Sequence, residues 1–345
     1  MVGQPVVSII VPTYNEDECI EKNIVSILSS GMDEDFFEVI YVDGGSVDKT
    51  KEIISKYSQE AKNIRLLENP KRYTPFALNI GILAAKGEYV ICVGAHSSFS
   101  KDYIEILVGE MIKGNFVAAG GTINILPRNN TEKARAIAKV LSHPFGVGGA
   151  DYRIKTENKE IRKVDTAGFL CYKRALLLEV GLYDERLFRN QDIELNKRIK
   201  HKGHEIYLVP TATMNYFARG NYIDLAKNNY ANGKWNLLTT YYCKGFRSLS
   251  LRHYVPLLFT LSLLVPGILA IIYVPFIYIS LISLVTYVVT LLLVSKKESQ
   301  RLKQFVYLLW AFIVLHFSYG VGSLLGVIKV IGMLMIPNKR KEKNG

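Results

Sequence analysis

The distribution of apolar residues is the feature that most constrains the fold of this chain of 345 residues. Up to about Leu249 they alternate with charged residues, as in a soluble α/β protein, and after His253 they form long blocks. About 21 residues run from Tyr254 to Val274 and about 20 from Pro275 to Val294, and a bilayer span needs roughly 20. We therefore expect three regions, a soluble domain over residues 1–249, a membrane domain over 250–338 and a basic tail over 339–345.

The last apolar block, from Gln304 to Ile336, is longer than one span requires. Its Gly320, Gly322 and Gly326 indicate either a close helix contact or a break. One continuous helix gives three membrane crossings and a hairpin gives four, and the basic tail favours an even number with both ends inside. The alternative is a set of buried core helices, which these lengths disfavour.

Basic residues flank the apolar blocks of a chain whose formal net charge is +12. They are Lys244, Arg247 and Arg252 before the blocks, Lys296, Lys297, Arg301 and Lys303 between them, and Lys339 to Lys343 after them. This is the positive-inside pattern, so anionic membrane lipids are the expected partner. Nucleic acid is not expected, because a recognisable binding module is missing. Met1–Pro5 has no features of a cleaved signal, so we expect a multi-pass protein of the cell membrane whose soluble domain is cytoplasmic.

The first half of the sequence alternates β-branched runs with amphipathic stretches. Strands are expected at Val6–Val11, Phe37–Val42, Ile64–Leu67, Tyr89–Val93 and near Phe116–Thr122, and helices at Glu16–Ser30, Asp48–Glu60 and Pro75–Lys86. This alternation predicts an α/β fold, with a mostly parallel central sheet and helices on both faces. Ligands of such sheets bind beyond the carboxyl ends of the strands.

Two further segments complete the predicted organisation of the soluble part. Thr131–Lys163 is polar and irregular, so we interpret it as a mobile loop or lid. A helix is expected from about Asn190 to Lys202, with Gly203 as its stop. The four cysteines, Cys19, Cys92, Cys171 and Cys243, lie far apart without metal or disulfide spacing, and we expect reduced, mostly buried thiols.

Polar residues follow the first two predicted strands. Val6–Val11 leads into Pro12-Thr13-Tyr14-Asn15-Glu16, where open backbone NH groups at a helix start suit a nucleotide. A simple N-cap by Asn15 or Thr13 is the alternative. The next strand delivers Asp43, followed by Gly44 and Gly45, and its carboxylate can accept a hydrogen bond from a uracil-type imide NH. Asp48 is expected to cap the following helix.

Together these segments resemble the family 2 glycosyltransferases. The family hallmark is an apolar strand ending in Pro-Thr-Tyr-Asn-Glu, followed about 30 residues later by Val-Asp-Asp-Gly-Ser-x-Asp-x-Thr, and Gly44 here replaces the second Asp. The resemblance continues through Asn69-Pro70, Ala77-Leu78-Asn79-x-Gly81 and Ala85-Lys86-Gly87-Glu88-Tyr89, and covers most of residues 5 to 240. It implies a nucleotide-diphospho-sugar transferase fold of the A type, inverting chemistry and donor contacts from Pro12, Thr13, Tyr14, Glu16, Asp43, Asn79 and Ala95.

Cations near this region can offset the charge of a diphosphate. We expect Lys71 and Arg72 to do so, and a solvated pair is the alternative. After the fourth strand the family carries Asp-x-Asp, which binds a divalent metal, and a succinoglycan-type subgroup has Asp-Ala-His. Here the segment is Gly94-Ala95-His96, so the resemblance implies that His96 is the metal ligand. Mg²⁺ prefers oxygen ligands, which makes Mn²⁺ the better candidate, and the missing carboxylate weakens the site. An ordinary loop histidine is the alternative.

The segment Gln191-Asp192-Ile193-Glu194-Leu195 matches the Gln-Asp-x-Glu-Leu of the same subgroup. An inverting transfer needs a base, and residues two apart on a helix point in nearly opposite directions, so only one acid faces the substrate. The match assigns the base to Asp192, and Glu194 caps the helix or holds an arginine. Gln191, Glu194, Lys234 and Trp235 are the expected contacts to acceptor or diphosphate. Alternatively, both acids merely favour the helix N-terminus, and Lys234 and Trp235 sit at the lipid interface.

The expected function is an inverting glycosyltransferase that moves a sugar from a nucleotide-diphosphate donor, UDP-hexose in the first instance, to a membrane-lipid-linked acceptor. It would serve polysaccharide or glycolipid synthesis. A polyprenyl-phosphate sugar transferase is one alternative, and its ionised phosphate acceptor would need no base. A catalytically inactive membrane scaffold is another, favoured by Gly44 and Gly94 in place of acids.

Overall fold

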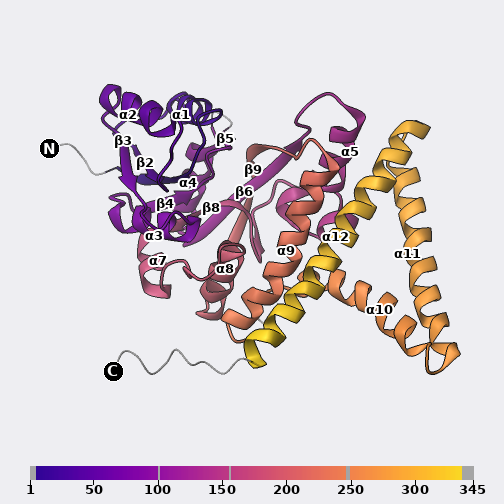
Figure 1. Cartoon of the computed structure of the whole chain (residues 1–345). Coiled ribbons are helices and arrows are strands. Elements are labelled where there is room, and N and C mark those ends of the chain that lie inside the picture. The colour runs from indigo at the N-terminus through magenta and orange to yellow at the C-terminus, as the bar shows by residue number, and fades with distance from the viewer. Residues whose placement is uncertain (1–4, 100–101, 155–156, 246–248, 336–345) are drawn as a thin grey trace. The chain divides into compact units, whose positions relative to one another are not determined.

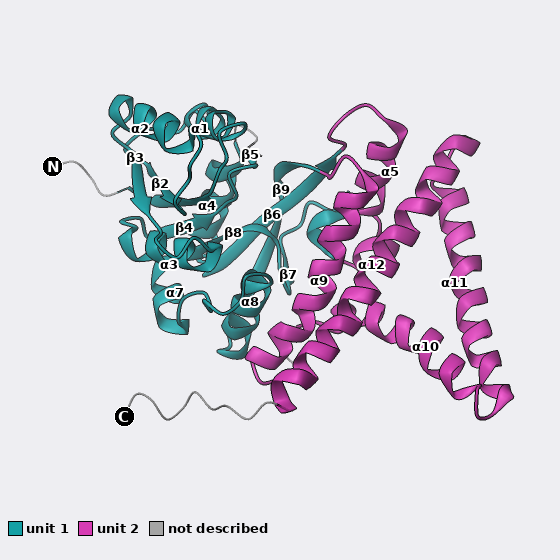
Figure 2. Cartoon of the chain, in the orientation of Figure 1, with its two compact units in different colours: residues 1–126, 150–217 teal, residues 127–149, 218–345 magenta. Residues whose placement is uncertain are grey.

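The computed structural model describes residues 5–99, 102–154, 157–245 and 249–335 (Figure 1). The predicted basic tail at 339–345, and Arg247, lie outside the described residues. The chain forms two compact units, one of residues 1–126 and 150–217, the other of 127–149 and 218–345 (Figure 2). We describe each unit by itself.

One mixed sheet organises the first unit. In the described part of the chain its strand order is β3-β2-β1-β4-β8-β6-β9-β5, with β7 paired to β9. The strands are β1 (Val7–Thr13), β2 (Phe37–Asp43), β3 (Ile64–Glu68), β4 (Tyr89–Cys92), β5 (Ser98–Phe99), β6 (Ala118–Leu126), β7 (Arg162–Val164), β8 (Gly168–Lys173) and β9 (Ile206–Phe217). Strands β1 to β4 pair in parallel, whereas β8 runs antiparallel to both β4 and β6. Strands β6 and β9 also pair in parallel, so the sheet is mixed, with the expected parallel pairing in its N-terminal part.

Helices cover both faces of this sheet. They are α1 (Ile20–Leu28), α2 (Thr50–Glu60), α3 (Thr74–Ala84), α4 (Tyr103–Lys113), α7 (Arg174–Val180) and α8 (Gln191–His201), and η1 (Asp151–Arg153) is a short 3₁₀ turn. Successive strand residues face opposite sides, so Ile9 packs in the core cluster that contains Ile24 of α1. Ile10 packs in the other cluster, with Ile82 of α3 and Leu195 of α8. The predicted layers and the three N-terminal helices are thus confirmed.

The interpretation of Thr131–Lys163 as a mobile loop is wrong for its described residues. This stretch holds α5 (Glu132–Val140), α6 (Pro144–Val147), η1 and the start of β7. Helix α5 begins at a Thr131 cap, whose hydroxyl accepts a hydrogen bond from the Ala134 NH at 3.2 Å. Its buried face consists of Ala134, Ala136, Ile137, Ala138 and Val140, so the stretch does carry an apolar face, which the sequence-based interpretation overlooked.

The second unit is helical. It contains α5, α6, α9 (Tyr222–Tyr242), α10 (Val255–Leu269), α11 (Ile277–Lys297) and α12 (Leu302–Met335), with 3₁₀ turns η3 (Leu251–His253) and η4 (Val274–Phe276). Among the described residues, two segments are long and apolar enough to cross a membrane, Val274–Lys297 with a mean hydropathy of 2.4 and Leu302–Met335 with 1.8. Because only 6% of the Val274–Lys297 window is buried within the protein, it does not fit a core helix.

Two other membrane predictions differ from the structure. Helix α12 is continuous, so the hairpin that would have given a fourth crossing is wrong. The expected span from Tyr254 to Val274 forms α10, whose 15 residues fall short of the roughly 20 that a span needs.

Glycines bring α9 and α12 into close contact, as the sequence indicated. A Cβ atom on Gly322 would collide with the carbonyl of Tyr230, and one on Gly326 would lie 2.8 Å from the carbonyl of Lys234. From the other helix, a Cβ on Gly233 would collide with the carbonyl of Tyr319. Small residues that let two backbones approach are typical of helix packing in membranes.

This packing predicts a difference between two glycines of the same helix. We expect Gly322→Ala to lower the free energy of unfolding by about 1–3 kcal/mol, because the added methyl overpacks the contact with α9. Gly332→Ala is the matched control, since among the described residues no atom lies within 4 Å of its Cβ position. It should be neutral or stabilising by up to about 1 kcal/mol. Thermal unfolding of the detergent-purified chain measures both, and equal melting temperatures would contradict the contact.

Candidate active site

Two loops are bound together at the carboxyl ends of β1 and β2. Strand pairing places Pro12 and Thr13 level with Val42 and Asp43. The backbone NH groups that follow β1 are not open, contrary to the sequence-based interpretation. They donate to side chains of the β2–α2 loop, from Asn15 to the Ser46 hydroxyl at 2.9 Å, Glu16 to the Thr50 hydroxyl at 2.7 Å and Asp17 to the Asp48 carboxylate at 3.2 Å. The helix N-cap is Cys19, so neither Asn15 nor Thr13 caps α1.

Asp43 organises the β2–α2 loop. Its carboxylate is buried and accepts hydrogen bonds from the NH groups of Gly45 and Ser46, both at 2.9 Å, and from the Ser46 hydroxyl. The Thr13 hydroxyl lies 3.4 Å away and the Lys51 ammonium 3.6 Å. Because a carboxylate has about four acceptor positions, the chain itself occupies most of them.

The structure accounts for the glycine at position 44. A Cβ atom there would lie 2.9 Å from the carbonyl oxygen of Arg72, which belongs to the β3–α3 loop. Arg72 has a φ of +67°, and its guanidinium lies 4.6 Å from the ring centre of Tyr14. Its neighbour Lys71 lies 4.6 Å from the ring centre of Phe76, and both cations are exposed. The β3–α3 loop therefore fills the space that an aspartate side chain at position 44 would need.

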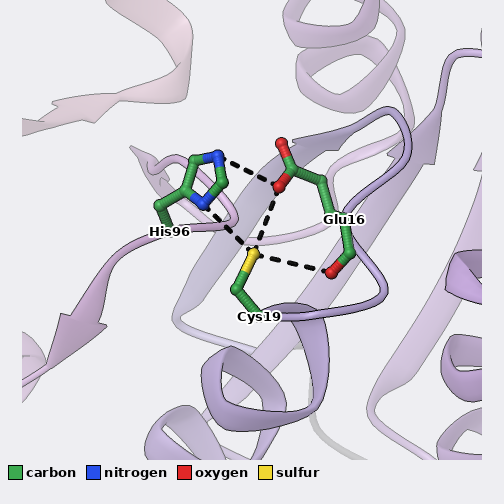
Figure 3. A group of neighbouring side chains, drawn as sticks. All are labelled: Glu16, Cys19 and His96. Carbon is green, nitrogen blue, oxygen red and sulfur yellow. Dashed lines mark hydrogen bonds and ion pairs between the residues drawn. The ribbon is translucent and has the colours of Figure 1, made fainter. Parts of the chain in front are cut away.

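His96 meets two residues of the β1–α1 loop, and Figure 3 shows the cluster. Its Nε2 lies 3.0 Å from the Glu16 carboxylate, and its Nδ1 lies 3.1 Å from the Cys19 sulfur. The Cys19 thiol in turn lies 3.1 Å from Glu16 Oε2. Burial, followed by the hydrogen bond and charge of Glu16, raises the pKa of Cys19 to about 12, so the thiol is protonated. Sequence reasoning missed Cys19, because no spacing rule connects it to His96.

Buried hydrogen bonds fix the loop that carries His96. Asn23 of α1 donates from Nδ2 to the Ser97 carbonyl at 2.8 Å and accepts from the Tyr41 hydroxyl at 3.0 Å. Ala95 is buried, whereas Gly94 is exposed. The only described atom near a Cβ at Gly94 would be the Ser97 hydroxyl, at 3.8 Å. Position 94 thus has room for a side chain, in contrast to position 44.

The two acids at the start of α8 have separate environments. Glu194 is buried, and both of its oxygens bind Arg198, from Nε at 2.7 Å and from Nη2 at 2.8 Å. Arg198 also donates to the carbonyls of Val180, Gly181 and Leu182, so the pair anchors the segment after α7. The interpretation that Glu194 holds an arginine is confirmed.

Asp192 is reached by solvent, but the surrounding protein desolvates its carboxylate and raises its pKa above the usual range. Arg153 opposes this shift through its positive charge. Sequence reasoning missed Arg153, because it lies in the stretch predicted as a loop. Tyr152, Tyr216 and Asp192 raise the pKa of its guanidinium, which therefore stays charged.

The remaining predicted site residues lie as follows. Asn79 is buried and pairs with the backbone of Tyr183, donating to its carbonyl and accepting from its NH, both at 2.9 Å. Gln191 is partly buried, and its Oε1 has no hydrogen-bond partner within the described ranges. Lys234 and Trp235 are partly buried on α9, in the second unit.

The sequence of this chain is similar to those of known proteins. Residues 8–181 match a family model described as Glycosyl transferase family 2. A protein of Methanococcus voltae named dolichyl N-acetyl-alpha-D-glucosaminyl phosphate 3-beta-D-2,3-diacetamido-2,3-dideoxy-beta-D-glucuronosyltransferase is 28% identical over 288 residues, which cover 81% of this chain and 87% of that protein. Succinoglycan biosynthesis protein ExoA of Rhizobium meliloti (strain 1021) is 26% identical, with 66% of this chain and 67% of that protein covered.

A solved structure shares the fold. The mannosyltransferase PcManGT from Pyrobaculum calidifontis, in complex with GDP-Man and Mn²⁺, superimposes with a TM-score of 0.58 at 18% identity, over 93% of this chain and 88% of that one. The expected A-type nucleotide-diphospho-sugar transferase fold, followed by apolar C-terminal helices, is thus confirmed.

The two glycines that stand in acidic positions should respond differently to a methyl group. We expect Gly44→Ala to lower the free energy of unfolding by about 1–3 kcal/mol, because the β3–α3 backbone must move. Gly94→Ala, the matched control, should stay within about 1 kcal/mol of the parent, since its Cβ position is open. Thermal unfolding of the full chain in detergent measures the stability of both variants. An equal loss of stability at both positions would be inconsistent with this packing.

Proposed function

The chain belongs to glycosyl transferase family 2, and we propose that it is an inverting enzyme that moves a hexose from a UDP-sugar to a lipid-linked acceptor. Family membership makes it a glycosyltransferase that acts on polysaccharide or lipid-linked substrates. The observation that carries the inverting proposal is Asp192. Of the two acids at the start of α8, Asp192 is the one that solvent reaches, because Glu194 forms an ion pair with Arg198.

The donor is proposed to bind across the loops after β1, β2 and β4. Thr13, Glu16, Asp43 and Ala95 lie at these strand ends, together with Pro12. Tyr14 and Arg72 add an aromatic ring and a cation that suit a nucleotide diphosphate, and Lys71 lies next to them. Asn79 would act indirectly, because both ends of its amide hold Tyr183. The solved relative with GDP-Man supports a nucleotide-sugar donor.

The acceptor is proposed to be a lipid-linked sugar. The Methanococcus voltae relative carries a dolichyl-linked sugar phosphate in its name, and it matches 81% of this chain. Two apolar helices, α11 and α12, would hold the chain in the cell membrane as a multi-pass protein with residues 1–249 in the cytoplasm. Gln191, Glu194, Lys234 and Trp235 remain proposed contacts to acceptor or diphosphate, although the ion pair of Glu194 favours an anchoring role.

In the proposed reaction, Asp192 takes the proton from the acceptor hydroxyl as that oxygen attacks the anomeric carbon. Its raised pKa makes it a stronger base than an ordinary aspartate. The nitrogen and oxygen of His96 and Glu16 fit Mn²⁺ better than Mg²⁺. Such a cation would supply positive charge to the departing nucleoside diphosphate.

Asp192→Asn tests the base. With UDP-glucose, Mn²⁺ and lipid extract, we expect the detergent-purified variant to release nucleoside diphosphate at least about 100-fold more slowly than the parent, because no group takes the acceptor proton. Asp165→Asn is the matched control, since Asp165 pairs with Lys197 and Lys200. A thermal shift caused by UDP-glucose, retained in Asp192→Asn, shows that donor binding survives.

Near-parental release by Asp192→Asn would remove this residue from the mechanism. It would favour the alternative of a polyprenyl-phosphate acceptor, which is already ionised and needs no base. A parent that neither releases nucleoside diphosphate nor gains thermal stability with any of a panel of nucleotide sugars would instead favour an inactive scaffold.

Arg153 gives a separate prediction on pH. Its charge lowers the pKa of Asp192, so Arg153→Gln should raise that pKa further. Because the base must be deprotonated, activity falls as the pH drops through this pKa, and the acidic limb of kcat/KM should move to higher pH in the variant. Arg153→Lys, which keeps the charge, should leave the limb nearer its parental position. Profiles of kcat/KM against pH measure this, and equal shifts in both variants would exclude an electrostatic cause.

A further inference from the structure

We propose that Glu16, Cys19 and His96 form a binding site for a borderline-soft divalent cation, of the class of Zn²⁺ and Co²⁺, with the sulfur of Cys19 as a ligand. The inference deepens the proposed function, on which it rests for the role of such a cation beside a donor diphosphate. Cation binding itself depends only on these three side chains. The family resemblance implied His96 as a metal ligand and Glu16 as a donor contact, and it did not point to Cys19.

The three donor atoms are already almost at ligand spacing. One donor from each residue lies within 4.8 Å of the other two. Glu16 Oε2 is 3.0 Å from one ring nitrogen of His96 and 3.1 Å from the Cys19 sulfur, which is 3.1 Å from the other ring nitrogen (Figure 3). Tetrahedral bonds of about 2.0–2.3 Å place ligand atoms about 3.3–3.7 Å apart. Because only one ring nitrogen of His96 can bind the same ion as Glu16 and Cys19, side-chain movements of about one ångström would admit it.

The chemistry of the donors selects the kind of cation. One sulfur, one imidazole nitrogen and one carboxylate oxygen suit Zn²⁺ or Co²⁺, whereas Mg²⁺ requires a near-octahedral set of oxygens. Gly94 contributes no carboxylate to the set. When the sulfur binds the ion, the thiol proton leaves to solvent, and the sulfur–metal bond replaces the hydrogen bond from Cys19 to Glu16.

The backbone holds these donors in place. Asn23, one helical turn beyond Cys19, binds the Ser97 carbonyl at 2.8 Å, next to His96. On the other side, the Glu16 NH donates to the Thr50 hydroxyl at 2.7 Å. Hydrogen bonds that fix the segments carrying metal ligands favour binding, because less of the site has to be ordered. The His96 side chain is 71% exposed and Glu16 is 18% exposed, so three protein ligands leave a fourth position open to water or to a phosphate oxygen.

Titration of the full detergent-purified chain with Co²⁺ tests the site. A cobalt–thiolate bond produces a charge-transfer absorption in the near ultraviolet, and we expect this band to saturate at one ion per chain. Cys19→Ser should abolish the band, and Cys19→Ser and His96→Ala should each weaken Co²⁺ binding at least about tenfold. Cys243→Ser is the matched control, because Cys243 is also a partly buried cysteine but lies in the second unit. It should retain both band and affinity.

A band that persists in Cys19→Ser, or parental Co²⁺ binding without a band, would overturn the proposed ligand. Unchanged melting temperature of Cys19→Ser shows that a lost band reflects a lost ligand rather than a lost fold. The two proposals fail separately. An intact cobalt band without sugar transfer to any lipid acceptor counts against the proposed function alone, and transfer without the band counts against this cation site alone.

Discussion

The carboxylate of Asp43 is buried at the end of β2, and it accepts hydrogen bonds from the Gly45 and Ser46 NH groups and the Ser46 hydroxyl. A buried charge without such donors costs several kcal/mol, so the β2–α2 loop must bring them to it. Ser46, thus placed, accepts from the Asn15 NH, and Thr50 from the Glu16 NH. The conformation of the β1–α1 loop therefore depends in part on a buried charge at the end of the neighbouring strand.

The two missing acids of the family pattern have different physical meanings. At Gly44 the carbonyl of Arg72 fills the space that a side chain would need. The position of the β3–α3 loop, which carries the cations, therefore requires a glycine at position 44. At Gly94 nothing in the described residues fills the space, and the loss of a carboxylate is a loss of charge alone. Only there would a single substitution restore the acid without moving backbone. The cluster of Cys19 with Glu16 and His96 supplies other donors at that same edge.

Patterns within one element were predictable from the sequence. The apolar runs predicted β1 and β2, and helical geometry alone indicated that Asp192 and Glu194 face different surroundings. Features that depend on partners distant in the chain were not predictable. Cys19 meets His96 across 77 residues, and the NH groups after β1 find side chains 31 to 34 residues away. Helix α5 was missed for another reason, because the charged residues between its apolar ones made the whole stretch look polar, although its buried face is apolar.

Helix α5 belongs to the unit that contains the C-terminal apolar helices. Residues 127–149 lie between β6 and η1 in the sequence, but they fold with the C-terminal helices. Lys139 of α5 pairs with Glu298 after α11, and His316 of α12 lies 2.9 Å from the Phe145 carbonyl. A carbonyl only accepts, so His316 Nε2 carries the proton, and Nδ1 is left to accept from the Tyr287 hydroxyl at 3.2 Å. Both imidazole nitrogens are thereby satisfied, which explains how a histidine is accommodated in an apolar helix. Arg153 follows this segment by four residues, so only a short stretch of chain separates the cation that acts on Asp192 from a segment that folds with the helices proposed to lie in the membrane.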